Sequence, residues 1–378
     1  MTRNCDIAII GGGPVGSALA LALKDSRLAV RLLEARTGES RDARALAISY
    51  GSRLLLERLG AWNSLSDVSP IRTIHISQKQ SFGRTLLTAS ELQVPELGYV
   101  LPYPSLQKAL SFEHALHGAN VTALEGREDC AEIRYLHEGA EHMLSARLAI
   151  LADGGRLLAD RHPPKTREYG QSALISHVTC QHMKPDTAFE RFTPEGPLAL
   201  LPYMDGYELV WTAPHAKVEE MLSLSDEAFL GALHDHFGDR VGRFTSLGKR
   251  SSFPLGLKKA KAQTPMPRVA LVGNAAQTMH PVAGQGFNMG LRDAWEIAQE
   301  ILDASAEELG TEKMLANYCS RRQTDREGGI AFTDSIVRLF SNDLPLVSPM
   351  RAASLSLLDA VPLAKKFVAR RMMFGSNG

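Results

Sequence analysis

The first thirty-four residues combine short apolar runs with one helical pattern. Residues 6–10 form a β-rich apolar run, a glycine-rich loop follows, and apolar residues at helical spacing continue to Leu23. A second apolar run, 29–33, ends at Glu34. This order predicts a strand, a helix and a second strand.

Short and alternating apolar runs dominate the middle of the chain. Alternation over residues 71–101 predicts strands that leave the first sheet for another and return, and the run 146–152 predicts a buried strand. Between residues 169 and 253, short apolar runs are punctuated by proline and glycine, which predicts a mostly antiparallel sheet. The helices expected in this part cover residues 105–117, 218–222 and 226–237.

The last third of the chain returns to the pattern of the beginning. An apolar run at 269–272 predicts a buried strand, and after a glycine-punctuated loop a helix is expected to begin near Gly286 and to reach Ile301. Further helical patterns cover residues 314–326, a segment at 330–340 and a tail from about 344 to 374.

These patterns predict an α/β protein in which two domains are interleaved along the chain. The first is a Rossmann-like dinucleotide-binding domain, and the second is a mostly antiparallel substrate domain. The expected segments are 1–72, 99–166 and 265–342 for the first domain, 73–98 and 167–264 for the second, and 343–378 for a C-terminal helical tail.

Composition narrows the choice of partners. The 42 basic and 42 acidic residues give a formal net charge of zero, so charge offers no reason to expect nucleic acid. The four cysteines lie far apart, without the spacing of a metal site or a disulfide framework, which favours a reducing compartment. No window is apolar enough to span a membrane. The expected location is therefore the cytoplasm, and peripheral attachment to the inner membrane stays open.

The glycines after the first apolar run form a dinucleotide-binding fingerprint. Gly11, Gly13 and Gly16 follow the strand and open the helix, and Glu34 ends the next strand about twenty residues on. Such glycines allow a tight turn and close approach of a pyrophosphate, and the carboxylate can accept hydrogen bonds from a ribose. The chain has no second fingerprint, so any nicotinamide cofactor is expected to dock transiently.

Two other segments have the form of an anion site. Gly284 and Gly286 stand just before the helix expected near residue 286, where free backbone amides and the helix dipole favour negative charge. A loop at Asp153 follows the buried strand 146–152 in the same way. Arg44 allows two interpretations, either a solvated turn or a contact with a cofactor phosphate or the isoalloxazine edge.

At this point the sequence resembles the class A flavoprotein aromatic hydroxylases, which share the para-hydroxybenzoate hydroxylase fold. The resemblance is strongest to their ubiquinone-biosynthesis branch, in particular to the 2-polyprenyl-6-methoxyphenol hydroxylases. Most of the family carries Gly-Asp-Ala-Ala-His where this chain has Asn274 and Gln277, and that variant is similar to this branch. The other matching segments are the fingerprint, residues 41–49, 152–154, 169–173, 190–202 and 284–288.

The resemblance implies bound FAD, with NADH or NADPH as a transient reductant. It assigns Gly11, Gly13, Gly16 and Glu34 to the ADP half of FAD. The pyrophosphate and ribityl regions fall to Arg44 and Asp153, and Asn274 can hydrogen-bond ribityl hydroxyls. The border of the flavin ring falls to Gly284, Gln285, Gly286, Phe287 and Asn288. His280 and Pro281 would lie on the substrate side, where His280 either assists deprotonation of a phenol or acts as a hydrogen-bonded positional residue.

The implied reaction is oxygen transfer from O₂, by way of a flavin C4a-hydroperoxide, to the ring of a polyprenyl phenol. A complex of ubiquinone-biosynthesis proteins is an implied partner. The basic amphipathic stretch at 355–371 either packs on the flavin domain or contacts lipid headgroups. Two other functions share the FAD fingerprint: a flavin reductase or dehydrogenase that does not insert oxygen, and a non-catalytic FAD-binding scaffold.

Overall fold

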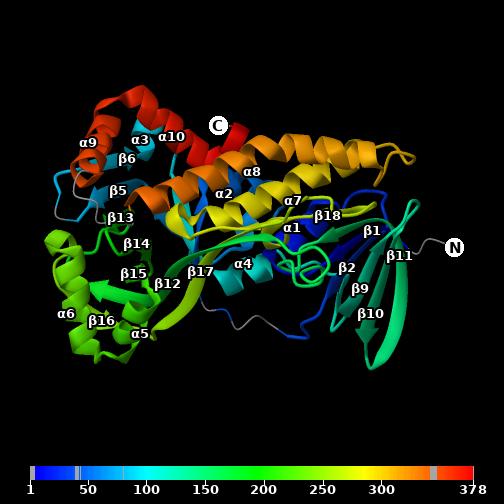
Figure 1. The fold of residues 1–378 in the computed structure, drawn as a ribbon, viewed down its shortest axis with the longest axis horizontal. Coiled ribbons are helices and arrows are strands. Elements are labelled where there is room, and N and C mark those ends of the chain that lie inside the picture. Colours follow the sequence, from blue (N-terminus) through cyan, green and yellow to red (C-terminus); the bar gives the residue numbers. More distant parts are fainter. Residues whose placement is uncertain (1–4, 39–41, 43, 80, 341–346, 378) are drawn as a thin grey trace.

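A computed structural model describes residues 5–38, 42, 44–79, 81–340 and 347–377, and its ribbon is shown in Figure 1. Three sheets organise these residues, and the predicted α/β class is confirmed. The first sheet has seven strands, in the order β8-β2-β1-β11-β10-β9, with β18 beside β11. They are β8 (Ala115–His117), β2 (Val30–Glu34), β1 (Cys5–Ile10), β11 (Ala140–Leu151), β10 (Ala131–His137), β9 (Asn120–Gly126) and β18 (Val269–Leu271).

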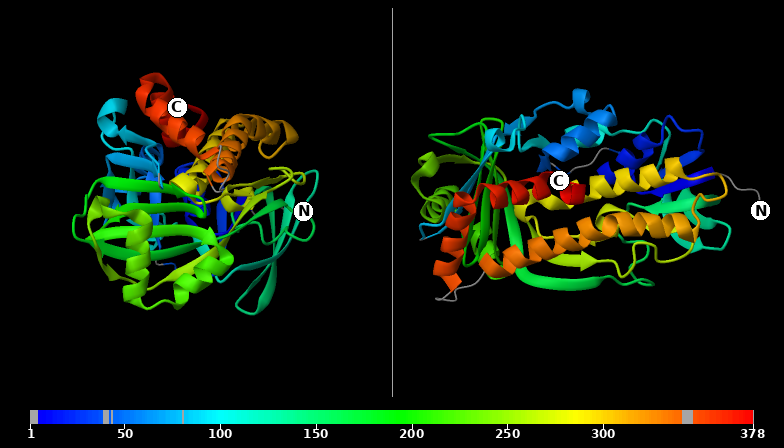
Figure 2. Two further views of the ribbon diagram at one scale, coloured as in Figure 1. Left: turned by 60° about the vertical axis from the view of Figure 1, so that its left-hand side comes forward. Right: turned by 90° about the horizontal axis from the view of Figure 1, so that it is seen from above.

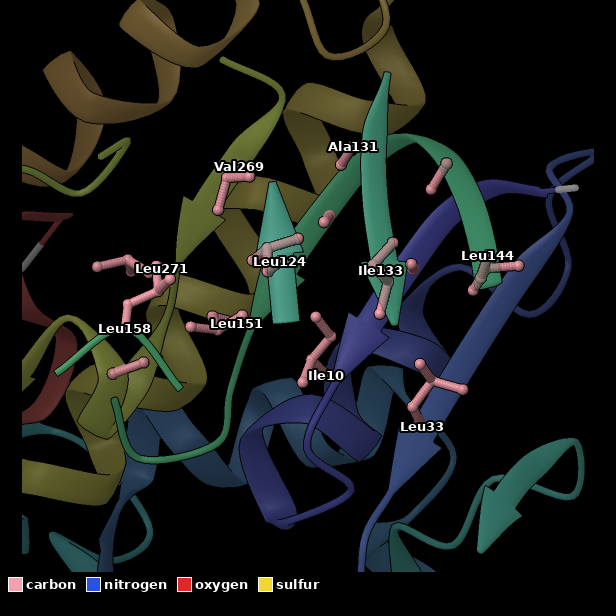
Figure 3. Packing of buried hydrophobic residues seen from close by; sticks show 14 of the residues in the cluster. Ile10, Leu33, Leu124, Ala131, Ile133, Leu144, Leu151, Leu158, Val269 and Leu271 are labelled. Atoms are coloured by element: carbon pink, nitrogen blue, oxygen red, sulfur yellow. The ribbon is translucent and has the colours of Figure 1, made fainter. Parts of the chain in front are cut away.

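The first sheet is parallel around β1 and is covered on both sides. β1 pairs in parallel with β2 and with β11, whereas β9, β10 and β11 form an antiparallel meander. Figure 3 shows the apolar side chains on one side, including Ile10, Leu33 and Ile133, gathered between the parallel strands and the meander. The other side packs against α1 (Pro14–Ala22), α7 (Gln285–Asp303) and α8 (Glu312–Phe340).

The second sheet has nine strands and lies beside the first domain. Its order is β19-β17-β12-β15-β14-β13-β5-β6, with β16 beside β12, and all pairings except that of β5 with β13 are antiparallel. The strands are β5 (Thr73–Gln78), β6 (Arg84–Thr88), β12 (Lys165–Cys180), β13 (Thr187–Thr193), β14 (Gly196–Tyr203), β15 (Gly206–Pro214), β16 (Phe244–Leu247), β17 (Ser251–Lys259) and β19 (Gln277–Thr278). One face packs against α5 (His215–Ser223) and α6 (Asp226–Phe237).

A small third sheet joins the two larger ones. It contains β3 (Ala45–Ser49), β7 (Gly98–Pro102) and β4 (Ser69–Ile71), and the short helices around it are α2 (Tyr50–Arg58), α3 (Ala89–Leu92) and α4 (Tyr103–Ala109). In Figures 1 and 2, α9 (Val347–Ala360) lies against β6, and α10 (Pro362–Phe374) runs back from it toward α2. Both large sheets draw strands from separated parts of the chain, so the interleaved architecture is confirmed, while the domain boundaries stay a prediction.

Two element predictions were wrong. The helix expected over residues 105–117 ends at Ala109, because Ala115–His117 instead pairs in parallel with β2 at the edge of the first sheet. The separate patterns at 314–326 and 330–340 are one continuous helix, α8, which lies along α7 in both views of Figure 2. Gly329 lies in that helix at the point where α8 packs on the Met289 side chain of α7.

Candidate functional site

The fingerprint glycines form the turn between β1 and α1. Gly11 has a φ of +107°, and a side chain there would meet the backbone of Ala152, while one at Gly16 would run into the Gly11 carbonyl. By contrast, a Cβ at Gly13 would have no atom within 4 Å. Gly13 is the N-cap of α1 and gives it no side-chain cap, and Pro14 at the first helical position has no N–H to satisfy.

Glu34 ends β2 and closes this turn. Its Oε2 accepts a hydrogen bond from the Gly12 amide at 2.6 Å, and its Oε1 accepts from the backbone amide and the Nε of Arg36 at 2.9 and 2.8 Å. Burial alone would raise the pKa of Glu34, but the hydrogen bonds from Arg36 and Gly12 outweigh it and hold the pKa below its usual value. Glu34 is therefore an oriented carboxylate at the edge of the turn.

Gln107 is a neighbour of the turn that the sequence did not reveal. Its Nε2 donates to the carbonyl of Gly12 at 2.9 Å, from α4, and its Oε1 accepts from the hydroxyl of Tyr103 at 3.4 Å. No motif marks this glutamine, because it lies ninety-five positions from the glycine that it contacts.

The loop after β11 stands next to the loop after β18. The two carboxylate oxygens of Asp153 accept from the amides of Gly155 and Leu157, both at 2.8 Å, which fixes the loop. A Cβ at Gly155 would lie 3.4 Å from the Cα of Ala275. Beside it, Asn274 is exposed. The structure thus gathers three predicted segments at the carboxyl ends of β1, β11 and β18, where ligands bind in such sheets.

The loop at 284–288 forms the start of α7. Gly284 has a φ of +60°, is the N-cap and supplies no side-chain cap, and a Cβ at Gly286 would have no atom within 4 Å. Phe287 is half-buried against the cluster between α1, α2 and α7. The start of α7 therefore resembles that of α1 in having no side-chain cap and open space beside a glycine.

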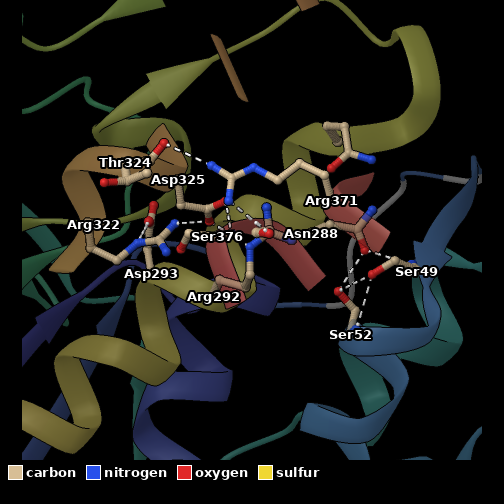
Figure 4. A network of polar contacts seen from close by, with 12 residues as sticks. Ser49, Ser52, Asn288, Arg292, Asp293, Arg322, Thr324, Asp325, Arg371 and Ser376 are labelled. Atoms are coloured by element: carbon tan, nitrogen blue, oxygen red, sulfur yellow. Dashed lines mark hydrogen bonds and ion pairs between the residues drawn. The ribbon is translucent and has the colours of Figure 1, made fainter. Parts of the chain in front are cut away.

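Asn288 and Gln285 fix this loop to the protein around it. The Oδ1 of Asn288 accepts from the amide of Ser49 and the hydroxyl of Ser52, at 2.8 and 2.7 Å (Figure 4). Its Nδ2 donates to the carbonyls of Gly284 and Ala47. Gln285 donates from Nε2 to the carbonyl of Met372, at 3.3 Å. The Asn288 amide is thus occupied by protein groups and positions the loop.

A buried ion network lies beneath the same loop. Asp293 is fully buried and accepts from the Gly273 amide at 3.0 Å, from Gln277 Nε2 at 2.7 Å and from Arg322 Nε at 2.7 Å. Arg322 also pairs with Asp325 at 2.9 Å (Figure 4). Gln277, one of the two substitutions in the family pattern, is therefore a buried structural residue.

Arg44 lies on the other side, between β3 and the second sheet. Its Nε donates to Asp42 at 2.8 Å, and its guanidinium carbon lies 5.4 Å from the ring centroid of Phe253 in β17. The side chain remains exposed. Arg41, the first residue of the matching segment 41–49, lies outside the described residues.

His280 is buried at the edge of the second sheet. Its Nδ1 accepts from the amide of Val282 at 3.2 Å, which places the proton of the neutral ring on Nε2, and its ring lies edge-on to Tyr169 at 5.5 Å. Burial lowers the pKa of His280 to about 4. Within the described part of the chain, nothing accepts a hydrogen bond from Nε2, so this buried donor has no protein partner. The following Pro281 starts the turn to Gly284.

Comparison with known proteins decides the family. The model of the FAD binding domain matches residues 4–330. The chain belongs to this family. It is 34% identical to the ubiquinone hydroxylase UbiL of Rhodospirillum rubrum, covering 98% of this chain and 90% of that protein. It is 31% identical to the 3-demethoxyubiquinol 3-hydroxylase of Escherichia coli, covering 96% of each.

Solved structures agree on the fold. The p-nitrophenol 4-monooxygenase PnpA of Pseudomonas putida superposes over 100% of both chains with a TM-score of 0.79 at 16% identity. HpxO of Klebsiella pneumoniae, solved with FAD and uric acid, covers 99% of this chain and 98% of that one, with a TM-score of 0.79 at 17% identity. The predicted fold is thus confirmed, and the family match and the relatives confirm the resemblance to FAD-dependent aromatic hydroxylases. The two uncapped helix starts with their open glycines suit a dinucleotide.

Proposed function

We propose that the chain is an FAD-dependent monooxygenase that hydroxylates the ring of a polyprenylated methoxyphenol in ubiquinone biosynthesis. The observation that carries this is the pair of uncapped helix starts, α1 and α7, with open space at Gly13 and Gly286, in a chain whose relatives are ubiquinone hydroxylases. Each helix start would present its positive end to a different anionic part of one extended cofactor.

The ADP half of FAD would lie along the fingerprint turn. Its pyrophosphate would approach the start of α1 at Gly13. Glu34 Oε2 would accept from a ribose hydroxyl in exchange for its 3.3 Å bond from Arg36 Nη2. Arg44 is exposed and could turn from Asp42 to a phosphate, and Asp153 fixes the loop beside the ribityl chain. Asn274, exposed next to that loop, would hydrogen-bond ribityl hydroxyls.

The flavin ring would lie against the 284–288 loop. When bound and reduced, FAD supplies the activation of O₂, and NADH or NADPH would supply the electrons. The helix dipole at the start of α7 would stabilise negative charge on the reduced ring by about 0.3–2 kcal/mol. Since Asn288 and Gln285 tie this loop to β3 and α10, that helix start is held in place before any ligand arrives.

His280 would act on the substrate side as a hydrogen-bond donor. Its neutral ring, with the proton on Nε2, can donate to a substrate or flavin oxygen but cannot take a proton at that nitrogen. The low pKa keeps the ring neutral throughout the physiological range. This favours the positional role over proton transfer.

Isotopic oxygen tests the function. The FAD-loaded protein would be given NADH or NADPH, a short-chain prenyl methoxyphenol and ¹⁸O₂, and the product analysed by mass spectrometry. We expect one labelled oxygen in a hydroxylated ring. Oxidation of the nicotinamide without labelled product would indicate a reductase, and absence of turnover with either nicotinamide and with a chemically reduced flavin would favour a scaffold.

We further propose that α9 and α10 contact the membrane in which a polyprenyl substrate would reside. Leu357, Leu363 and Phe367 are 65%, 82% and 68% exposed, and Lys366 and Arg370 are exposed beside them. Large apolar side chains next to basic ones suit anionic lipid. No described helix is long and apolar enough to cross a bilayer. Membership of a complex of ubiquinone-biosynthesis proteins stays a prediction.

Vesicle flotation tests the membrane contact. Leu363→Asp should reduce binding to anionic vesicles, because it removes an apolar anchor and adds a repelled charge. Leu302→Asp, at an exposed leucine of α7, is the matched control and should bind as the parent does. Equal flotation of both variants would contradict the proposed surface.

A further inference from the structure

Glu190 is a carboxylate without a protein partner in the middle of the second sheet. It lies in β13, at the start of the 190–202 segment that matches the ubiquinone-biosynthesis branch. Among the described residues, none hydrogen-bonds or forms an ion pair with its side chain. Loss of hydration raises the pKa of Glu190 to about 7. The Glu190 side chain is only partly buried, yet no described residue forms an ion pair with it in the middle of the sheet, so its carboxylate is open to a partner from outside the chain.

The side chain points to the face of the sheet opposite α5 and α6. Phe189, its neighbour in β13, packs into the cluster under those helices, and successive residues of a strand point to opposite faces. Glu190 pairs with Ile76 of β5 on one side and Ala199 of β14 on the other, and Ala199 pairs with Val210 of β15. These four residues form one row across the sheet, here called the Glu190 row.

The Glu190 row is partly exposed, whereas the positions on either side of it in β13 are closed. Phe192, 5% exposed, stacks on Phe340 of α8 with ring centroids 4.1 Å apart. Ala188, 4% exposed, packs in a cluster with Ile71 and Val100 of the third sheet. All four members of the row keep partial access to solvent although they lie on central strands. The row is therefore open to solvent between two closed positions of β13.

One end of the Glu190 row abuts the predicted flavin loop through α10. Ile76 packs against the cluster that contains Met373. The carbonyl of Met373 accepts from the hydroxyl of Ser49 at 2.8 Å, and the carbonyl of Met372 accepts from Gln285. α10 thus borders the cluster at one end of the row through Met373 and is bonded to the 284–288 loop through Met372.

The charged groups around the row are engaged elsewhere. Arg191 points to the other face, where its Nε donates to the carbonyl of His236. On the surrounding elements, Glu208 of β15 lies near Arg44 and is bonded to the Ala45 amide. Asp334 of α8 is paired with Arg167 and Arg338, and Arg351 of α9 is bonded to the Phe340 carbonyl. Glu190 is thus left as the carboxylate facing an apolar row.

We propose that Glu190 accepts the hydrogen bond of the substrate's phenolic hydroxyl and takes up its proton as the ring is oxygenated. The inference rests on the proposed function and names the group that activates the phenol. The phenolic O–H bond breaks, an O–H bond to Glu190 forms, and the electron pair left on the phenol oxygen makes the ring more nucleophilic. Glu190 returns the proton to solvent after the product leaves, so it is unchanged by turnover.

A binding experiment without turnover isolates the hydrogen bond. The oxidised, FAD-loaded protein would be titrated calorimetrically with the phenol and with its methyl ether, which lacks the donated proton. The parent protein should prefer the phenol by roughly 10- to 100-fold, the range for a hydrogen bond to a charged group, and Glu190→Gln should lose most of that preference. Glu195→Gln, at the exposed turn of the same hairpin, is the matched control and should keep it.

Kinetics isolate the proton transfer. In Glu190→Gln, kcat should fall roughly 10²- to 10⁴-fold, KM should rise in line with the weaker binding of the phenol, and the acidic limb of the pH profile near 7 should disappear. Glu190→Asp should restore part of that limb. Unchanged FAD content and circular dichroism of these variants exclude misfolding as the cause.

Two results would overturn the inference. If the parent hydroxylates the phenol while Glu190→Gln keeps both the phenol preference and the acidic limb, Glu190 has no such role although the proposed function stands. If the parent neither binds nor hydroxylates the phenol, the proposed function fails and the inference fails with it.

Discussion

Replacing Asp293 by asparagine should destabilise the protein far more than such a small change in size suggests. The two carboxylate oxygens of Asp293 face donors only: the Gly273 amide and Gln277 Nε2 on one side and Arg322 Nε on the other. An asparagine must turn its NH₂ group toward one of these donors. In either orientation of the asparagine, its NH₂ group faces an N–H donor of the protein. Arg322, which is 2% exposed, also loses the negative charge that neutralises it.

The expected loss is about 3–5 kcal/mol, the cost of removing one partner of a buried ion pair. For a chain of 378 residues, an unfolding entropy of about 2.1 cal/mol/K per residue converts this into a fall in Tm of roughly 4–6 °C. Differential scanning calorimetry of the apoprotein measures it directly. Since Asp293 also holds the Gly273 amide, FAD affinity should fall as well.

Two further variants serve as controls for this prediction. Asp303→Asn makes the same chemical change at the exposed end of α7 and should change stability by less than about 0.5 kcal/mol. Asp293→Leu combined with Arg322→Met replaces the pair by apolar groups and should recover much of the loss. A Tm for Asp293→Asn within 1 °C of the parent would refute the reasoning.

The other predictions concern the fingerprint turn between β1 and α1 and the loop at 284–288. Gly16→Ala should lower the Tm and abolish FAD binding, because its Cβ would meet the Gly11 carbonyl. Gly13→Ala should keep the apoprotein Tm and lower the affinity for FAD by about 10-fold, as measured by flavin fluorescence. Gly286→Asp should leave the apoprotein Tm unchanged yet remove stoichiometric flavin absorbance, and retained FAD would contradict the placement of the ring. Glu34→Gln should lower the free energy of unfolding at pH 7, but the difference from the parent should vanish in acid. The lowered pKa of Glu34 stabilises the fold above the unfolded pKa of about 4.3, and that contribution disappears as the pH falls through the folded pKa. Chemical denaturation at several pH values measures the difference.

Local sequence predicted the parts of the site that are built from neighbouring residues. The glycines of the fingerprint and Glu34 belong to one strand-helix-strand unit, so their spacing alone places them together, and β1, α1 and β2 are confirmed. The early end of α4 was not predictable in this way. The residues after Ala109 continue a helical pattern, and only pairing with β2 draws Ala115 into a strand.

Residues whose roles depend on distant partners were missed or misjudged. Asp293 and Arg322 stand in helical patterns where charged residues usually face solvent, and nothing in the sequence shows that they meet. The sequence marks Glu190 only as the first residue of the 190–202 segment, which resembles the ubiquinone-biosynthesis branch. Its isolation depends on what α8 and the third sheet cover on either side, which the order of residues does not show.

The hydrogen bonds between α10 and the 284–288 region have a consequence for the synthesis of this protein on the ribosome. Gly16 leaves the ribosome early, but the carbonyls of Met372 and Met373 that anchor Gln285 and Ser49 are made about 360 residues later, roughly 20–70 s at ordinary elongation rates. During that interval the nascent chain contains the fingerprint turn but lacks the α10 carbonyls that hold the 284–288 loop. Tight capture of FAD is therefore expected only after translation of α10, and the supply of FAD should influence late maturation more than early folding.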